Sequence, residues 1–328
     1  MNLKYDVEAD WVLLTTCNFR CAYCFVPLAD LEAKLTTYGT NAQWAEGFDA
    51  TEKSWLLHMS GGEPSIYPGF VDLCERLTRN HCLSINSNLS HRCIEAFAER
   101  INPERVHFIN AAVHYDERQK KTSLDVFIAR VQKLRMHGFQ VLVSLVMTPL
   151  LVRNFPEMSR YFESHGLFLI PKVMRDRYQG KIYPNAYATD QKSLIVEHLA
   201  KARQKYATVI AAMGEPATIN MFADDHLLNS TTIYRGKLCG SGYNFVRIEP
   251  DGAVVRCGSG MPLGNILLKN VRLLGAPKPC DSFYCSYFCK KYTSAQFVPA
   301  QETKRDVDDG FFLTLKAWRD SQRRQQDR

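Results

Sequence analysis

Thr16-Cys-Asn-Phe-Arg-Cys-Ala-Tyr-Cys24 is the stretch around which this sequence is organised. Its cysteines, Cys17, Cys21 and Cys24, are spaced Cys-x3-Cys-x2-Cys and directly follow the apolar run 11–14. A cubane iron–sulfur cluster normally has four cysteine ligands, so three on one loop would leave one iron open. An open position is typical of a catalytic rather than a structural metal site. The alternative is a zinc site that takes a fourth ligand from elsewhere in the chain.

A second motif follows about forty residues later. Residues 56–64, Leu-Leu-His-Met-Ser-Gly-Gly-Glu-Pro, predict a strand that runs into a turn made by Gly61, Gly62, Glu63 and Pro64. Glycines after a strand allow the backbone to come close to a ligand, and a carboxylate beside them suits an ammonium group. The same residues would also suit an ordinary strand-to-helix turn. Its position after the cysteine loop favours the ligand site.

The two motifs together resemble those of radical S-adenosylmethionine (SAM) enzymes. The resemblance implies that Cys17, Cys21 and Cys24 hold a [4Fe–4S] cluster whose open iron binds the amino and carboxylate groups of SAM. It also implies that Tyr23 lies by the adenine and that residues 61–64 line the methionine amino group. One electron from the cluster would cleave SAM into methionine and a 5′-deoxyadenosyl radical, which takes hydrogen from a substrate. An external one-electron donor such as flavodoxin or ferredoxin would supply that electron.

Composition narrows the class of protein. The 328 residues are 46% hydrophobic and 23% charged, as in a globular protein. No apolar run is long enough to span a membrane, and the N-terminus has no signal-peptide core. Eleven cysteines, without a disulfide framework, favour a reducing cytoplasm. The net charge of +7 is spread along the chain, so we expect no nucleic-acid partner. Only 16 residues precede Cys17, and we expect no fused N-terminal cobalamin-binding or peptide-recognition domain.

Alternating strand and helix patterns over residues 1–224 predict an α/β fold with a parallel sheet. Six strands are predicted, at residues 11–16, 56–60, 83–88, 106–113, 141–147 and 167–173. Helices are predicted between them and after them, including residues 70–79, 127–137 and 190–214. Six strands fit the partial (β/α)6 TIM-like barrel of the family that the chain resembles. We expect a small cysteine-rich hairpin and helix domain over residues 225–300, and a helix and tail over residues 301–328.

Ligands of such barrels gather at the carboxyl ends of the strands, so residues there are further candidates. Asn86 and Asn88 end the third strand and Ser144 lies in the fifth, all three as possible SAM contacts. His114 stands where many relatives have a serine that touches the SAM ribose, and we expect it to face the substrate. Arg175 follows the sixth strand and could bind a carboxylate or phosphate.

The last five cysteines lie within 51 residues: Cys239, Cys257, Cys280, Cys285 and Cys289. Pro250-Asp-Gly252 predicts a hairpin that brings Cys239 and Cys257 together. Four such thiolates suit a second iron–sulfur cluster or zinc. The pattern resembles the SPASM region of radical SAM enzymes in its truncated form, called twitch, which implies one auxiliary cluster, of the [4Fe–4S] type. Cys239, Cys257 and Cys289 are the firmest ligands, with Cys285 or Cys280 as the fourth. The cysteine left over could return a hydrogen atom to a substrate radical.

The leading hypothesis is a radical SAM oxidoreductase or epimerase that acts on a small polar molecule, such as a sugar, an aminocyclitol or a natural-product intermediate. In the second hypothesis the same chemistry modifies a ribosomal peptide or a protein side chain. In the third, from another class, the chain is a non-catalytic binding protein stabilised by zinc.

Overall fold

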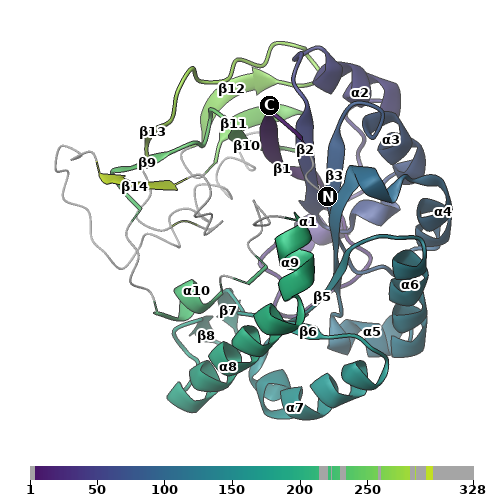
Figure 1. Cartoon of the computed structure of the whole chain (residues 1–328), viewed down its shortest axis with the longest axis vertical. Coiled ribbons are helices and arrows are strands. Elements are labelled where there is room, and N and C mark those ends of the chain that lie inside the picture. Colours follow the sequence, from purple (N-terminus) through teal and green to yellow (C-terminus); the bar gives the residue numbers. More distant parts are fainter. Residues whose placement is uncertain are drawn as a thin grey trace.

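The computed structural model describes residues 4–213, 221–222, 224–229, 234–257, 260–280, 285 and 293–297. Its centre is a nine-stranded sheet in the order β12-β11-β10-β1-β2-β3-β4-β5-β6 (Figure 1). Strands β10 and β1 to β6 run parallel to one another, β11 runs antiparallel to β10, and β12 runs antiparallel to β11. The strands are β1 (Val7–Leu14), β2 (Trp55–Gly61), β3 (Cys82–Ser87), β4 (Val106–Ala112), β5 (Val141–Val146), β6 (Leu169–Lys172), β10 (Phe245–Ile248), β11 (Ala253–Arg256) and β12 (Met261–Asn265).

Helices connect successive parallel strands, and in Figure 1 α2, α3, α4 and α6 line one side of the sheet. The helices are α1 (Leu28–Glu32), α2 (Asn41–Asp49), α3 (Phe70–Leu77), α4 (Cys93–Arg100), α5 (Tyr115–Lys121), α6 (Leu124–Met136), α7 (Pro149–Ser164), α8 (Thr189–Lys205), α9 (Ala207–Met213) and α10 (Asp225–Asn229), with 3-10 turns η1 (Pro64–Ile66) and η2 (Pro103–Arg105). This is the predicted α/β fold of a partial barrel, and all six predicted strands are present.

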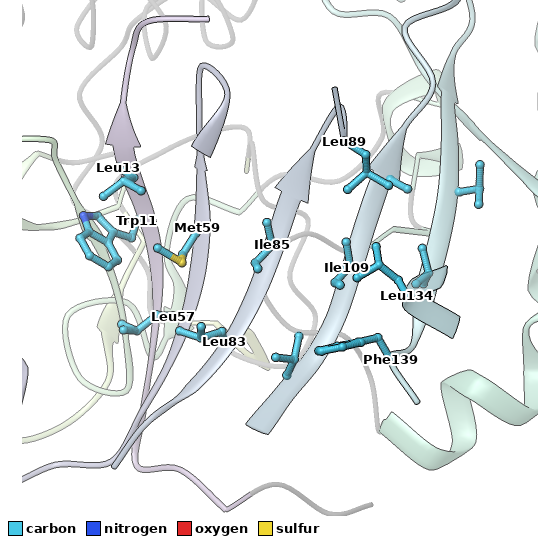
Figure 2. Close-up of a cluster of buried hydrophobic side chains, with 14 of the residues drawn as sticks. Trp11, Leu13, Leu57, Met59, Leu83, Ile85, Leu89, Ile109, Leu134 and Phe139 are labelled. Atoms are coloured by element: carbon cyan, nitrogen blue, oxygen red, sulfur yellow. The ribbon is translucent and has the colours of Figure 1, made fainter. Parts of the chain in front are cut away.

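The two faces of the sheet differ in character. One face carries apolar residues that pack against the helices, among them Met59, Ile85 and Ile109 (Figure 2). Because side chains alternate along a strand, their neighbours Ser60, Asn86 and Asn110 lie on the other face. That face holds buried polar groups lower in the sheet as well, where the His58 ring lies between Glu8 and Ser84. This inner face is therefore polar at these positions, and it also carries the apolar residues Phe108, Leu142 and Ile170, which pack with α8.

Two predictions about elements need correction. The predicted helix 190–214 is two helices, α8 and α9, separated at Tyr206. Tyr206 leaves helical geometry (φ −94°, ψ 11°) where its buried hydroxyl donates to Phe168 O at 2.7 Å, a contact that fixes the ring against the sheet. The Pro250–Gly252 hairpin is confirmed, but its first strand, β10, pairs with β1 and so extends the barrel sheet.

Two small sheets complete the described part of the chain. β7 (Asp176–Tyr178) and β8 (Lys181–Tyr183) form a hairpin after β6. β9 (Lys237–Cys239) lies between β13 (Lys278–Pro279) and β14 (Thr293–Phe297). The domain limits at residues 224 and 300 remain predictions, and residues 301–328 lie outside the described residues. No helix among the described residues is long and apolar enough to cross a membrane.

Candidate active site

The cysteine loop leaves the carboxyl end of β1. Cys17, Cys21 and Cys24 are free thiols of intermediate exposure. The pKa of Cys17 is raised to about 11 and that of Cys21 to about 12, mainly by burial, with a smaller contribution from the neighbouring thiols. The three groups are thus close enough to affect one another, in a place that disfavours an uncompensated thiolate. Iron would displace the thiol protons and compensate the charge, so this donor set fits a cluster.

Within the described residues, no three His, Cys, Asp or Glu side chains are arranged to hold a single metal ion. A mononuclear zinc site needs its ligands in one coordination sphere. The cysteines of a [4Fe–4S] cluster bind through different irons and need no shared coordination sphere.

The diglycine of the second motif packs against the chain just before the cysteine loop. Gly62 N donates to Leu14 O at 2.8 Å, and Glu63 N donates to Thr16 O at 3.0 Å. A Cβ on Gly62 would lie 1.9 Å from Thr16 O, and one on Gly61 would lie 2.0 Å from Leu14 O. Gly61 also has φ +117°, a conformation that favours glycine. In this structure the close approach that the glycines permit is to the cysteine loop itself.

The Glu63 carboxylate is buried and accepts four hydrogen bonds. The donors are Ser65 N at 3.1 Å, Ser65 Oγ at 2.5 Å, Ser87 Oγ at 2.6 Å and Asn88 N at 2.7 Å. Burial raises the pKa of Glu63, while these donors act to lower it. The carboxylate thus joins the turn after β2 to the end of β3, in addition to the role at the SAM amino group that the resemblance implies.

Asn88 also acts on the cysteine loop. Its Nδ2 donates to Asn18 Oδ1 at 2.9 Å, and Asn18 Nδ2 donates to Ser90 Oγ at 2.6 Å. The backbone carbonyl oxygen of Asn88 accepts a hydrogen bond from the buried Arg118 guanidinium. The end of β3 therefore supports the loop between the first two cysteines.

Helix α5 and the residue before it form the other side of this support. Four of their side chains contact successive residues of the loop. Lys121 Nζ donates to Asn18 O at 2.6 Å, and the Arg118 guanidinium lies 5.5 Å from the centre of the Phe19 ring. Glu117 Oε2 accepts from Arg20 N at 2.9 Å, and His114 Nδ1 lies 3.4 Å from Cys21 Sγ. The helix and His114 together therefore support the loop from Asn18 to Cys21. No motif in the sequence of the helix predicts this role.

The structure places the two predicted substrate residues in different surroundings. His114 lies against the cysteine loop, where its Nδ1 is 2.8 Å from Tyr23 Oη. Arg175 follows β6, with a guanidinium nitrogen 3.7 Å from Asp224 Oδ1. The same carboxylate accepts from Lys172 Nζ at 2.6 Å and is 1% exposed. Two cations thus share one buried carboxylate at the end of β6.

Three polar residues line the inner face at the middle strands. Asn86 on β3 and Asn110 on β4 are register partners, and Asn110 Nδ2 donates to Asn86 Oδ1 at 2.6 Å. Asn110 Oδ1 is buried and has no hydrogen-bond partner in the described part of the chain. Ser144 lies on the next strand, opposite Ala112, and is also buried. A buried polar oxygen without a partner is costly, which indicates that this face receives a polar ligand.

Comparison with known families agrees with this arrangement. Residues 11–163 match the model of the Radical SAM superfamily, from β1 to near the end of α7. Over these residues the chain is similar to that superfamily. The match contains both motifs and the strand ends at Asn86, Asn88, His114 and Ser144.

Solved structures show the same fold. The chain superposes on anSMEcpe with bound AdoMet and Cp18Cys peptide with a TM-score of 0.53 and 15% identity, over 80% of this chain and 78% of the other. It superposes on Streptococcus suis SuiB bound to precursor peptide SuiA with a TM-score of 0.50 and 13% identity, over 78% of this chain and 60% of SuiB. At these identities the likeness concerns the fold.

Downstream of residue 163, three of the last five cysteines, Cys239, Cys257 and Cys280, are linked through Ser241 and strand β9. Ser241 N donates to Cys239 Sγ at 3.5 Å, and Cys257 N donates to Ser241 Oγ at 3.1 Å. Cys280 directly follows β13, which pairs with β9, and its N–H donates to Lys237 O at 2.8 Å. Cys285 is of intermediate exposure. Cys289 lies outside the described residues, so the ligand set of an auxiliary cluster remains a prediction.

Three residues of the site could not be found from the sequence: Asn110, Glu117 and Arg118. Ser87 lies in the polar stretch 84–88, which the sequence predicts as a possible SAM contact. Asn110 carries only a weak local signal, because its strand also contains the polar His107. Glu117 and Arg118 act through contacts with residues that are distant in the sequence.

The Gly62 contact gives a first prediction. Gly62→Ala forces the Cβ into Thr16 O, so we expect the free energy of unfolding to fall by roughly 1–3 kcal/mol, with less iron bound per chain. Chemical denaturation and metal analysis after anaerobic reconstitution would measure both effects. Gly275→Ala is the matched control, since a Cβ there meets no atom within 4 Å. Wild-type stability and iron content in Gly62→Ala would show that the two segments need not approach so closely.

Proposed function

We propose that this protein is a radical SAM enzyme whose Cys17, Cys21 and Cys24 hold a [4Fe–4S] cluster, with SAM on the open iron. The observation that carries the proposal is that two separate segments of the chain contact the three-cysteine loop from two sides. The Gly62–Glu63 turn packs against its start, and α5 contacts its middle. In a radical SAM domain this loop is the part that must not move.

When bound, the cluster and SAM supply an electron and a 5′-deoxyadenosyl group, which takes a hydrogen atom from the substrate. The residues of this chain bind and orient these groups. Tyr23 is proposed to bind the adenine, the backbone of residues 61–64 the methionine amino group, and Asn86 and Ser144 polar groups of SAM from the inner face. Glu63 and Asn88 contribute by fixing the turn and the loop in addition to any contact with SAM. An external one-electron donor such as flavodoxin or ferredoxin is the proposed partner.

The substrate that we favour is a small polar molecule, such as a sugar, an aminocyclitol or a natural-product intermediate, which undergoes oxidation or epimerisation. The inner face supports this choice because Asn86, Asn110 and Ser144 offer hydrogen-bonding groups in a buried place. The cations Lys172 and Arg175 at the end of β6 suit an anionic group on such a molecule. A polar site of this kind discriminates strongly against analogues that lack the matching groups.

A second candidate is a maturase that modifies a peptide or protein side chain. The observation in its favour is that anSMEcpe and SuiB share this fold and that the structures are described with a bound peptide and a bound precursor peptide, respectively. The inner face would then bind one polar side chain of the peptide.

One isotope experiment tests the reaction and separates the two substrates. Extract from cells grown on a deuterated carbon source is divided into a fraction below about 1 kDa, treated with protease, and a fraction of peptides and proteins. Each is incubated anaerobically with the reconstituted protein, SAM and a reductant. We expect 5′-deoxyadenosine one mass unit heavier with the small-molecule fraction only, since the radical removes one deuterium. The shift with the larger fraction alone would favour the maturase, and the absence of deoxyadenosine would contradict the radical reaction.

The auxiliary cluster gives a separate prediction. If Cys239 and Cys257 are ligands of a second cluster, their replacement by alanine should lower the iron content from about eight to about four per chain. Cleavage of SAM should persist, while an oxidised product should no longer form, because the acceptor of the second substrate electron is missing. Cys74→Ala is the control, since Cys74 is buried in α3 among apolar residues. Full iron content in the double variant would contradict the assignment.

A further inference from the structure

His114 has an unusual backbone conformation next to the cysteine loop. It precedes α5 with φ 46° and ψ 57°, in the left-handed region. Residues other than glycine seldom adopt this conformation, although histidine does so more often than most. Two contacts of Arg118 hold it there, since Arg118 N donates to His114 O at 2.9 Å and Arg118 Nε donates to Val113 O at 2.8 Å. The chain thus maintains a costly geometry that directs this ring to the loop.

The ring is enclosed by residues of the loop. It lies nearly parallel to the Tyr23 ring, with centroids 6.2 Å apart and 16° between the planes, and the Phe19 ring meets it edge-on at 6.1 Å. Its Nδ1 faces two loop atoms at once, with Tyr23 Oη at 2.8 Å and Cys21 Sγ at 3.4 Å. Tyr23 is also a hydrogen-bond partner of Cys21. His114, Tyr23 and Cys21 therefore form one hydrogen-bonded group.

The three cysteines differ in the source of their hydrogen bonds. Cys17 Sγ accepts from the backbone N–H of Phe19 at 3.4 Å, and Cys24 has a backbone hydrogen bond from Val26. Cys21 instead has the side chains of Tyr23 and His114. Among the described contacts, Cys21 is thus the ligand whose sulfur environment depends on side chains. Burial would otherwise leave a Cys21 thiolate poorly stabilised.

We propose that, when Cys21 is a cluster ligand, His114 carries its proton on Nδ1 and acts with Tyr23 to donate hydrogen bonds to the Cys21 sulfur, which raises the reduction potential of the cluster. This inference rests on the proposed function, because it requires a cluster at the loop. Hydrogen bonds to the sulfurs are one of the factors that set the potential of an iron–sulfur cluster. The reduced cluster carries one more negative charge, so donors stabilise it more than the oxidised form. His114 is in this account a positioning and tuning residue rather than a substrate contact.

The test is a redox titration of the full-length reconstituted protein, followed by low-temperature electron paramagnetic resonance. The signal of the loop cluster is identified by its change when SAM is added. In His114→Phe, we expect the ratio of reduced to oxidised cluster at a fixed potential to fall about tenfold, as for the loss of one hydrogen bond to a charged group. For a one-electron couple this is a shift of about 59 mV to more negative potential. His114→Gln retains an N–H donor and should lie between His114→Phe and the wild type.

Two further variants make the result decisive. Tyr23→Phe removes a donor with little change of shape and should also shift the potential to more negative values. His165→Phe, which changes an exposed histidine after α7, should leave it unchanged. If His114→Phe binds too little iron to titrate, Tyr23→Phe and His114→Gln decide the question. Wild-type potentials in the variants that bind a cluster, or a shift to more positive values, would overturn the inference alone. A wild-type protein without a SAM-responsive signal would instead overturn the proposed function.

Discussion

The chain after β2 passes so close to the end of β1 that no side chain fits between them. The contact between Gly62 and Thr16 joins the two motifs into one unit. It also fixes the start of the cysteine loop relative to the parallel sheet, whose strand ends carry the remaining polar groups. Most other features of the site can be understood as consequences of this one approach of two backbones.

The rest of the loop is held by side chains that belong to later strands and helices. Glu63 connects the turn to the end of β3, and Asn88 connects that end to Asn18. Helix α5, together with His114 before it, contacts the loop from Asn18 to Cys21. Several of these groups are buried and charged, and each is neutralised or hydrogen-bonded locally, as burial requires. A loop supported in this way can hold three thiols in place while their protons are replaced by iron. Rigid support of the ligands is what a reactive metal site requires.

The two faces of the sheet explain a difficulty in reading the sequence. The outer face is apolar and packs against the helices, so the strands could be predicted from their apolar runs. β1, however, begins at Val7, earlier than its apolar run suggests, because Glu8 and Asp10 are buried on the inner face with partners on β2. Such buried polar residues look like loop residues until their partners on neighbouring strands are known.

The sequence likewise predicts the part of the site that consists of local motifs, and it does not predict the residues that support those motifs. Cys17, Cys21, Cys24 and the glycine turn are local motifs, and the sequence alone places them together. The supporting roles of Arg118 and Glu117, and the place of His114 beside Cys21, depend on contacts between residues about one hundred positions apart. The addition of β10 to the edge of the barrel likewise depends on a pairing of distant segments, which no local pattern reveals.

The central claim is that the loop from Cys17 to Cys24 holds an iron–sulfur cluster that cleaves SAM. The most direct measurement compares iron, sulfide, zinc and released 5′-deoxyadenosine between the anaerobically reconstituted wild type and a variant with Cys17, Cys21 and Cys24 replaced by alanine. The account predicts that the variant loses about four irons per chain and forms no deoxyadenosine. Equal iron in the two proteins, or a variant that loses zinc rather than iron, would contradict it.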